Sequence, residues 1–387
     1  MSAGAGCGRK PLPGGSAKDA DMSPERLKRA SAVIREAIGR KELPGAVLLV
    51  SRRGRIVLHE AYGDKSLVSE RAPMAAEAIF DLASLTKPVA TATSVMILAE
   101  RGELSLWDRV KMYVPGFEPY RDWLGEPADE ARLWHLLTHT SGLPAYTNAE
   151  EAGRSLGNPC STEALVGHIA ALPKTAAPGA KFVYSCLGYI TLAHIVGRVT
   201  GRSIAEFAAD NIFKPLKMKA TSYLPDPKLA GRLVPTQVID GAPLLGVVHD
   251  PLARLQGGVS GNAGLFSSAE DLAVFAEMLL NGGEYRGVRI LGPLAVERMI
   301  SIYPRTAESG RGLGWDLDSA YSSNGGDIFG QQGFGHTGYT GTSLWIDPET
   351  KTTVVLLTNS VHPDDKGTVV PLRARVANAV AAAILKK

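Results

Sequence analysis

The stretch ASLTKPVATATSVMILAE, residues 83–100, combines an apolar helical pattern with a lysine, Lys87, near its start. The ring of Pro88 cannot follow a full helical turn, so the helix is expected to begin at or near Ser84. At this end backbone N–H groups lack partners and the macrodipole is positive, which suits a developing oxyanion. Lys87 follows Ser84 by three residues and therefore shares its face of the helix.

The position of Lys87 indicates a catalytic role. The helix dipole and burial both disfavour its charge, so we expect a lowered pKa of Lys87 and an amine that accepts a proton from Ser84. The alternative is a capping serine followed by a lysine that reaches solvent. About one Ser-x-x-Lys match is expected by chance in this chain, so the motif needs companions.

Two companions follow. In PGAKFVYSCLGYITLAHIVGRVTG a short extended piece ends at Tyr184 and a helix begins where Ser185 can cap it, which would hold the phenol at a turn for proton transfer. In GFGHTGYTGTSLWID glycines flank the His336–Gly338 segment at the start of a strand. Those glycines permit close approach of a substrate to the backbone.

With SLTK at 84–87, YSC at 184–186 and HTG at 336–338, the sequence resembles the serine hydrolases of the penicillin-recognising superfamily. That superfamily contains class C β-lactamases, D-Ala-D-Ala carboxypeptidases and other D-amino-acid peptidases, and the related family VIII esterases. The resemblance continues through LLTHTSGLP at 136–144 and GNAGLFSSAEDLAVFAEMLLNGG at 261–283.

The resemblance implies a role for each matching residue. Ser84 would be the acylated nucleophile, Lys87 its base, and Tyr184 the group that passes the proton to the leaving group and back from water. His336 would orient the substrate and the relay. The backbone amides of Ser84 and Tyr339 would form the oxyanion hole. Thr337, Gly338 and Cys186 complete the expected substrate-binding set, and no metal or cofactor is implied.

Two departures from the family pattern bear on the substrate. Cys186 replaces the usual asparagine, whose amide holds the amide of the substrate, and His336 replaces the lysine of efficient β-lactamases. We therefore expect a carboxylesterase that acts on small or medium esters. A D-amino-acid peptidase such as a DD-carboxypeptidase, or a weak class C-like β-lactamase, is the alternative. A penicillin-binding sensor module without turnover is the non-enzymatic alternative.

Other motifs are weaker. GRSLG at 153–157 matches the nucleophile elbow of α/β-hydrolases, but polar flanks and Pro159 make Ser155 a loop serine. His135 and His139 stand four residues apart, yet the glutamate of a zinc-protease helix is missing, so both are read as structural. The pair His249–Asp250 lacks partners at ligand spacing and is expected at most to line the cleft.

The flanks of the chain predict a sheet made from both ends. Residues 23–41 favour a helix, 45–63 a hairpin, 341–359 a second strand pair and 369–385 a closing helix. Further helices are expected at 88–100, 187–199 and 269–280. The expected fold is α/β (α+β): a β-lactamase/transpeptidase-like central antiparallel sheet flanked by helices, with a mainly helical lobe. We expect a disordered tail at 1–21, a sheet lobe from 22–80 and 330–387, and the helical lobe with cleft loops at 81–329.

Composition excludes several other classes. The 42 basic and 39 acidic residues are scattered and give a net charge of +3, which argues against nucleic-acid binding. No apolar run reaches membrane-spanning length, and the first residues lack the apolar centre of a signal peptide. As the chain stands we expect a cytoplasmic protein, with export as the alternative if a leader was removed. Cys7, Cys160 and Cys186 predict no disulfide or thiolate metal site. The expected partner is a small-molecule ester or amide, and a homodimer is compatible with the sequence.

Overall fold

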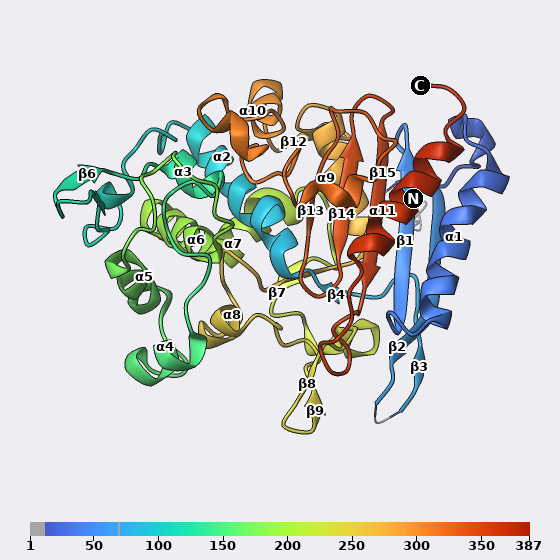
Figure 1. Ribbon diagram of the computed structural model, residues 1–387. Helices are drawn as coiled ribbons and strands as arrows, with labels where there is room; N and C mark the ends of the chain where they lie inside the picture. The colour runs from blue at the N-terminus through green and yellow to red at the C-terminus, as the bar shows by residue number, and fades with distance from the viewer. Residues whose placement is uncertain (1–11, 69) are drawn as a thin grey trace, which may run out of the picture.

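A six-stranded antiparallel sheet forms the core of the computed structural model, which describes residues 12–68 and 70–387 (Figure 1). Its strand order is β13-β14-β15-β1-β2-β3. The strands are β1 (Gly45–Arg52), β2 (Arg55–Ser66), β3 (Ala72–Pro73), β13 (Phe334–Thr337), β14 (Ser343–Asp347) and β15 (Thr352–Thr358). β1 pairs with β2 on one side and with β15 on the other. The two ends of the chain therefore share one sheet, as predicted.

Helices cover both faces of this sheet. Because side chains alternate along a strand, Leu48 and Val50 of β1 pack with the terminal helices α1 (Pro24–Gly39) and α11 (Val370–Ala383). Val47 and Leu49 point the other way, into a core that includes helix α9 (Ala269–Leu280). The two terminal helices were predicted to cover the sheet. The sequence did not predict that α9, from the middle of the chain, covers the opposite face.

The middle of the chain is mainly helical, and Figure 1 shows it beside the sheet. Its helices, besides α9, are α2 (Thr93–Glu100), α3 (Leu133–Leu137), α4 (Ala149–Leu156), α5 (Thr162–Ala171), α6 (Cys186–Thr200), α7 (Ile204–Ala208), α8 (Pro251–Leu255) and α10 (Pro293–Met299). A three-stranded sheet joins β4 (Phe80–Asp81), β10 (Leu265–Ser267) and β7 (Ser222–Tyr223). Three short hairpins complete this region: β5 (Tyr120–Arg121) with β6 (Pro127–Asp129), β8 (Val238–Ile239) with β9 (Ala242–Pro243), and β11 (Glu284–Tyr285) with β12 (Val288–Arg289). The lobe boundaries at 81 and 329 stay predictions.

The predicted disordered tail, 1–21, is wrong for residues 12–21. Leu12 is fully buried in the main core, and Gly14 forms a bridge with Ile56 of β2. The carbonyl of Ala20 accepts a hydrogen bond from the buried guanidinium of Arg52 at 2.5 Å. The composition of this segment suggested disorder, but these few contacts anchor it. Residues 1–11 lie outside the described part of the chain.

Candidate active site

The predicted nucleophile lies on a tight turn between β4 and α2. Ser84 sits in a 3-10 turn, Ala83–Leu85, and the backbone of Ala83 has a left-handed φ of 46°. The carboxylate of Asp81 supports this turn by accepting the N–H of Ala83 at 2.9 Å. Pro88 has no N–H to donate, and the chain passes through a π-helical turn, Lys87–Ala92, before α2 begins. Unusual backbone of this kind often marks functional sites.

Lys87 is fully buried beneath this turn. Its Nζ donates hydrogen bonds to Ser84 Oγ at 2.9 Å and to the backbone carbonyl of Asn262 at 3.0 Å. It also lies 5.1 Å from the ring centre of Tyr184 and 5.9 Å from that of Tyr189. The alternative of a lysine that reaches solvent is therefore wrong, because every contact of the ammonium is inside the protein.

The pKa of Lys87 is shifted in the opposite direction to the prediction. Burial lowers the pKa of Lys87, but the negative charges that Cys186 and Tyr184 can carry raise it, and the net pKa lies above that of an ordinary lysine. Those two charges exist only after the thiol or the phenol has ionised. Burial raises the pKa of Tyr184 and of Cys186 as well. The predicted lowering of the Lys87 pKa is wrong because it left out these two neighbours.

Tyr184 is fixed at the start of α6. The Ser185 side chain caps this helix by accepting the N–H of Gly188. Behind the phenol, the ring of His139 is tilted by 30° against that of Tyr184, with 4.4 Å between the ring centres. Nδ1 of His139 accepts the N–H of Ser185 at 3.0 Å. Burial raises the pKa of Tyr184, while the charge of Lys87 and a hydrogen bond to Ser84 lower it. The phenol therefore faces both Ser84 and Lys87.

His336 contributes a neutral acceptor from strand β13. Its Nδ1 lies 2.8 Å from the carbonyl of Thr337, which identifies this nitrogen as the one that carries the proton. Nε2 is then an acceptor, and it is buried without a hydrogen-bond partner among the described residues. Burial lowers the pKa of His336, and the charges of Arg311 and Lys87 lower it further. The imidazole is therefore uncharged at neutral pH.

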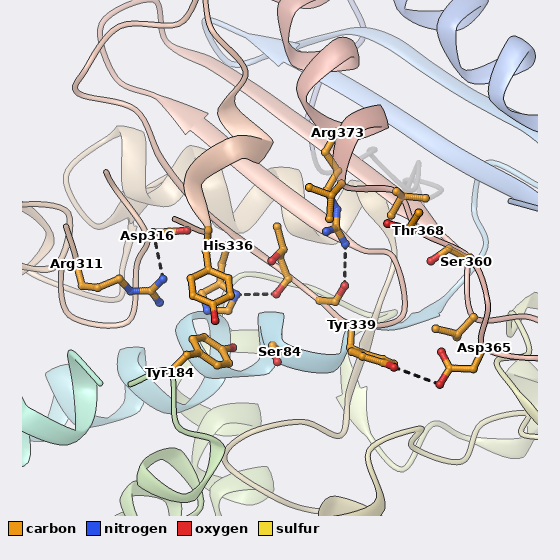
Figure 2. A pocket seen from close by; sticks show the side chains of 17 residues that line it. Ser84, Tyr184, Arg311, Asp316, His336, Tyr339, Ser360, Asp365, Thr368 and Arg373 are labelled. Atoms are coloured by element: carbon orange, nitrogen blue, oxygen red, sulfur yellow. Dashed lines mark hydrogen bonds and ion pairs between the residues drawn. The ribbon is translucent and has the colours of Figure 1, made fainter. Parts of the chain in front are cut away.

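A cleft of about 350 Å³ is lined by most of the predicted site residues, among them Ser84, Tyr184 and His336 (Figure 2). In this view Ser84 lies between Tyr184 and Tyr339. Within the described part of the chain the backbone N–H of Tyr339 makes no hydrogen bond, so it is free to bind an oxyanion. The lining residues are Ser84, Tyr184, Arg311, Asp316, Tyr321, His336, Thr337, Gly338, Tyr339, Ser360, Val361, Asp365, Gly367, Thr368, Val369, Val370 and Arg373.

A sequence profile named Beta-lactamase matches residues 30–379. The chain belongs to the β-lactamase family. It is 32% identical to the "N-acetylmuramyl-L-alanine amidase" of Bacillus subtilis strain 168, over 90% of this chain and 84% of that protein. It is also 32% identical to a "Putative D-alanyl-D-alanine carboxypeptidase" of Salmonella schwarzengrund strain CVM19633, over 82% of this chain and 79% of that one. Among solved structures, "EstCE1, a hydrolase with promiscuous acyltransferase activity" aligns with a TM-score of 0.75 at 24% identity, covering 92% and 99% of the two chains.

Not every residue that was assigned to this β-lactamase-family site lies in the cleft wall. Cys186 stands at the start of α6 beside Lys87 and Asn262, and its side chain is not among those that line the cleft. Its expected place in substrate binding is therefore indirect. Thr337 and Gly338 do line the cleft, next to His336.

The competing motifs lie elsewhere. Ser155 belongs to helix α4, not to a loop as predicted, and its hydroxyl donates to the carbonyl of Glu151 at 3.0 Å. His135 is buried, which lowers its pKa to about 4, and its Nδ1 accepts the N–H of Arg132. His249 stacks on Tyr339 at the edge of the cleft. In the ranges 12–68 and 70–387 no group of histidine, cysteine or acidic residues has the geometry to hold a metal.

Three further residues of the site were missed from the sequence. The backbone carbonyl of Asn262 accepts a hydrogen bond from Lys87, and the ring of His139 packs against that of Tyr184. Arg373 of α11 donates from Nη2 to the carbonyl of Gly338 at 2.8 Å. Asn262 and His139 lie in stretches that carried the family resemblance, but the sequence did not indicate their roles in the site. Nothing in the pattern of the last helix marked Arg373.

Among the described residues, none of the helices combines the length and the apolar composition that a membrane span requires.

Proposed function

We propose that the chain is a carboxylesterase that hydrolyses small or medium esters through an acyl-enzyme on Ser84. The observation that carries this proposal is the 2.9 Å contact between the buried Lys87 Nζ and the Oγ of Ser84, which lines the cleft. The absence of a side-chain amide at Cys186 supports ester substrates, which bring no N–H to be held. The chain is a serine hydrolase of the β-lactamase family, and the preference for esters is what we propose beyond that.

The acylation step follows from which side chains of the site carry protons. The pKa values of Lys87 and Tyr184 are both raised, and the two groups stabilise each other's charged forms. In the proposed step Lys87 is an ammonium and Tyr184 is the phenolate that it stabilises. As Ser84 Oγ attacks the substrate carbonyl, its proton passes to Tyr184 and the negative charge moves to the carbonyl oxygen. The backbone N–H groups of Ser84 and Tyr339 would bind this oxyanion.

The second half of the cycle repeats these transfers in reverse. When the tetrahedral intermediate collapses, the bond to the leaving oxygen breaks and Tyr184 donates its proton to it. A water molecule then enters, gives a proton to Tyr184 and attacks the acyl carbon. Collapse of the second intermediate returns a proton to Ser84 Oγ and releases the carboxylic acid. The Nε2 of His336, unpartnered among the described residues and on a ring 6.0 Å from that of Tyr184, would orient the groups that exchange these protons.

Amide hydrolysis on cell-wall peptides is the second candidate. It is favoured by the two relatives at 32% identity, which are named as an amidase and a carboxypeptidase. An amide leaving group is poorer than an alkoxide, so it depends more strongly on proton donation from Tyr184.

Intact-mass analysis tests the nucleophile. Wild type, Ser84→Ala and the matched control Ser155→Ala are exposed briefly to a p-nitrophenyl ester or to a penicillin. An acyl adduct is expected in wild type and Ser155→Ala and is expected to be missing from Ser84→Ala. An adduct that survives in Ser84→Ala and disappears in Ser155→Ala would overturn the assignment.

Turnover separates the remaining candidates. The values of kcat/KM for a p-nitrophenyl ester and for N-acetylmuramyl-L-alanine are compared on the same preparation. A higher value for the ester supports the esterase, and a higher value for the amide supports the second candidate. Stoichiometric acylation with neither substrate turned over would indicate a sensor module.

A further inference from the structure

The two backbone N–H groups that would bind the oxyanion come from segments far apart in the sequence. Ser84 lies on the turn after β4, and Tyr339 lies in the loop after β13 (Figure 2). Both N–H groups must point at one carbonyl oxygen, so the two segments need a fixed link. Part of that link is a hydrogen bond at 2.8 Å from the hydroxyl of Thr340 to the carbonyl of Asp81, the last residue of β4.

The side chain of Asp81 makes a second part of the link. This carboxylate is 2% exposed, and its two oxygens accept different backbone N–H groups. Oδ1 accepts that of Ala83 at 2.9 Å, and Oδ2 accepts that of His249 at 2.7 Å. Ala83 immediately precedes Ser84, and its left-handed φ of 46° costs energy for a residue other than glycine. One oxygen of Asp81 therefore holds the turn that presents the nucleophile.

His249 extends the link to the other half of the oxyanion hole. Its ring stacks on that of Tyr339, with 5.5 Å between the ring centres and 21° between the planes. The next residue, Thr340, returns to the carbonyl of Asp81 through its hydroxyl. Asp81, His249 and the segment 339–340 therefore form a closed ring of contacts.

The charge of Asp81 suits it to hold two donors at once. Burial raises the pKa of Asp81 to about 6, while the N–H groups of His249 and Ala83 lower it, so the group is a carboxylate at neutral pH. Both oxygens of a carboxylate accept hydrogen bonds, and bonds to a charged acceptor are stronger than neutral ones. An asparagine at this position could accept only one of the two N–H groups, because its amide nitrogen is itself a donor.

We propose that Asp81 is a positioning residue that sets the geometry of the oxyanion hole, with one oxygen on the Ser84 turn and the other on the His249–Tyr339 side. This inference rests on the proposed acyl-hydrolase function. Asp81 does not line the cleft, so it acts through the backbone that it holds. Its effect appears where negative charge develops on the carbonyl oxygen, and binding of an uncharged ligand hardly depends on it.

A pair of ketones measures the oxyanion hole without turnover. Ser84 Oγ adds to the carbonyl carbon of 1,1,1-trifluoro-4-phenylbutan-2-one and forms a C–O bond. The carbonyl electron pair moves to its oxygen, and the proton of Ser84 passes to Tyr184. The matched compound, 4-phenylbutan-2-one, lacks the fluorine atoms and binds as the intact ketone. Calorimetric titration gives both Kd values, and the ratio of the methyl ketone Kd to the trifluoromethyl ketone Kd reports how well the oxyanion is stabilised.

Asp81→Asn is the decisive variant, because it keeps the size of the side chain and loses one of the two hydrogen bonds. In the wild type we expect the trifluoromethyl ketone to bind at least about a hundredfold tighter than the methyl ketone. Asp81→Asn is expected to weaken the trifluoromethyl ketone at least about tenfold and to change the Kd of the methyl ketone less than about twofold. The kcat/KM for a p-nitrophenyl ester should fall by a similar factor.

Thr340→Val tests the ring of contacts at a second point. It removes the hydroxyl that donates to the Asp81 carbonyl and keeps the size of the side chain. We expect it also to weaken the trifluoromethyl ketone and to leave the methyl ketone unchanged. Because both substitutions open the same ring, the double variant should lose less than the product of the two single effects. A loss equal to that product would overturn the proposed link between the two halves of the oxyanion hole.

Asp271→Asn is the matched control. Asp271 is also a buried carboxylate, and burial raises its pKa to about 6. It accepts the N–H of Ala220 at 2.7 Å and the hydroxyl of Thr221 at 2.8 Å, but it does not line the cleft. Asp271→Asn should lower the free energy of unfolding, as Asp81→Asn does, and leave the Kd ratio unchanged. An equal fall of the ratio in both variants, or an unchanged ratio in Asp81→Asn, would overturn the positioning role.

Ester turnover separates this inference from the function on which it rests. A wild type that turns over no ester, with a Kd ratio that still falls in Asp81→Asn, would disprove the esterase and leave the positioning role standing. A wild type that hydrolyses the ester, with an unchanged ratio in Asp81→Asn, would leave the esterase and remove the positioning role. Equal Kd values of the two ketones in the wild type would also overturn the positioning role, because no oxyanion is then stabilised.

Discussion

At the scale of single residues, the chemistry of this cleft depends on how three ionisable side chains share protons. Lys87, Tyr184 and Cys186 meet in a buried cluster, and each raises or lowers the pKa of the others. A serine and a lysine at helical spacing could be recognised in the sequence, and so could the tyrosine. The order in which they lose protons could not, because it depends on burial and on Cys186, which approaches Lys87 only through the tertiary fold.

The pH dependence of acylation should reveal this order. Activity requires the Lys87–Tyr184 pair to lose one proton, and both pKa values are raised. The kcat/KM for a neutral ester is therefore expected to rise about tenfold per pH unit through neutrality and to level off only at alkaline pH. Burial lowers the pKa of His139 and of His336, so neither should add an inflection near pH 6.5. A plateau that is already complete at pH 6 would instead favour a neutral Lys87 as the base.

At the scale of elements, the site depends on turns more than on helices. The helices at 187–199 and 269–280 were predicted within one or two residues, because their apolar spacing and caps are local properties. The turn that carries Ser84 was placed correctly, but its 3-10 and π-helical geometry was not. That geometry follows from Pro88 and from tertiary contacts, such as the bond between Lys87 and the Asn262 carbonyl 175 residues away.

Gly261 shows how closely two elements must approach for this contact. A Cβ at Gly261 would lie 2.0 Å from the carbonyl oxygen of Tyr189 and 2.7 Å from the Cβ of Ala193, both on α6. Gly261→Ala is therefore expected to lower the free energy of unfolding by about 2 kcal/mol, as overpacking does, and to reduce kcat by displacing Asn262 from Lys87. Urea unfolding and ester kinetics measure the two effects. Gly231→Ala, with open space around its Cβ, is the control and should change neither.

At the scale of the whole molecule, the sheet unites segments that are far apart in sequence. Arg52, fully buried on β1, donates to the carbonyls of Ala20, Asp21, Thr350 and Lys386. The central antiparallel sheet could be predicted from strand patterns at both ends of the chain. The packing of residues 12–21 could not, because their glycine- and proline-rich composition gives no periodic signal. Their anchors, such as the burial of Leu12 and the hydrogen bonds from Arg52, are tertiary contacts.

Arg52 should therefore contribute strongly to global stability. Arg52→Met removes a donor from four carbonyls, of which Asp21 keeps the N–H of Leu385 and Thr350 keeps the hydroxyl of Thr352. We expect the free energy of unfolding to fall by about 3 kcal/mol. Thermal and chemical unfolding measure the change. Arg29→Met, at an exposed position of α1, is the matched control and should fall within about 0.5 kcal/mol of wild type. A similar loss in both variants would show that the Arg52 contacts are not the cause.

The position of β1 between β2 and β15 has a consequence for how the protein is made. On the ribosome the first strand emerges early, yet its second neighbour appears only after residue 358 has been translated. His336 and Arg373 also arrive late, so a nascent chain carries the nucleophile long before it carries the far wall of the cleft. Reactivity is thus withheld until these residues have been translated, and one edge of β1 needs protection from aggregation in the meantime.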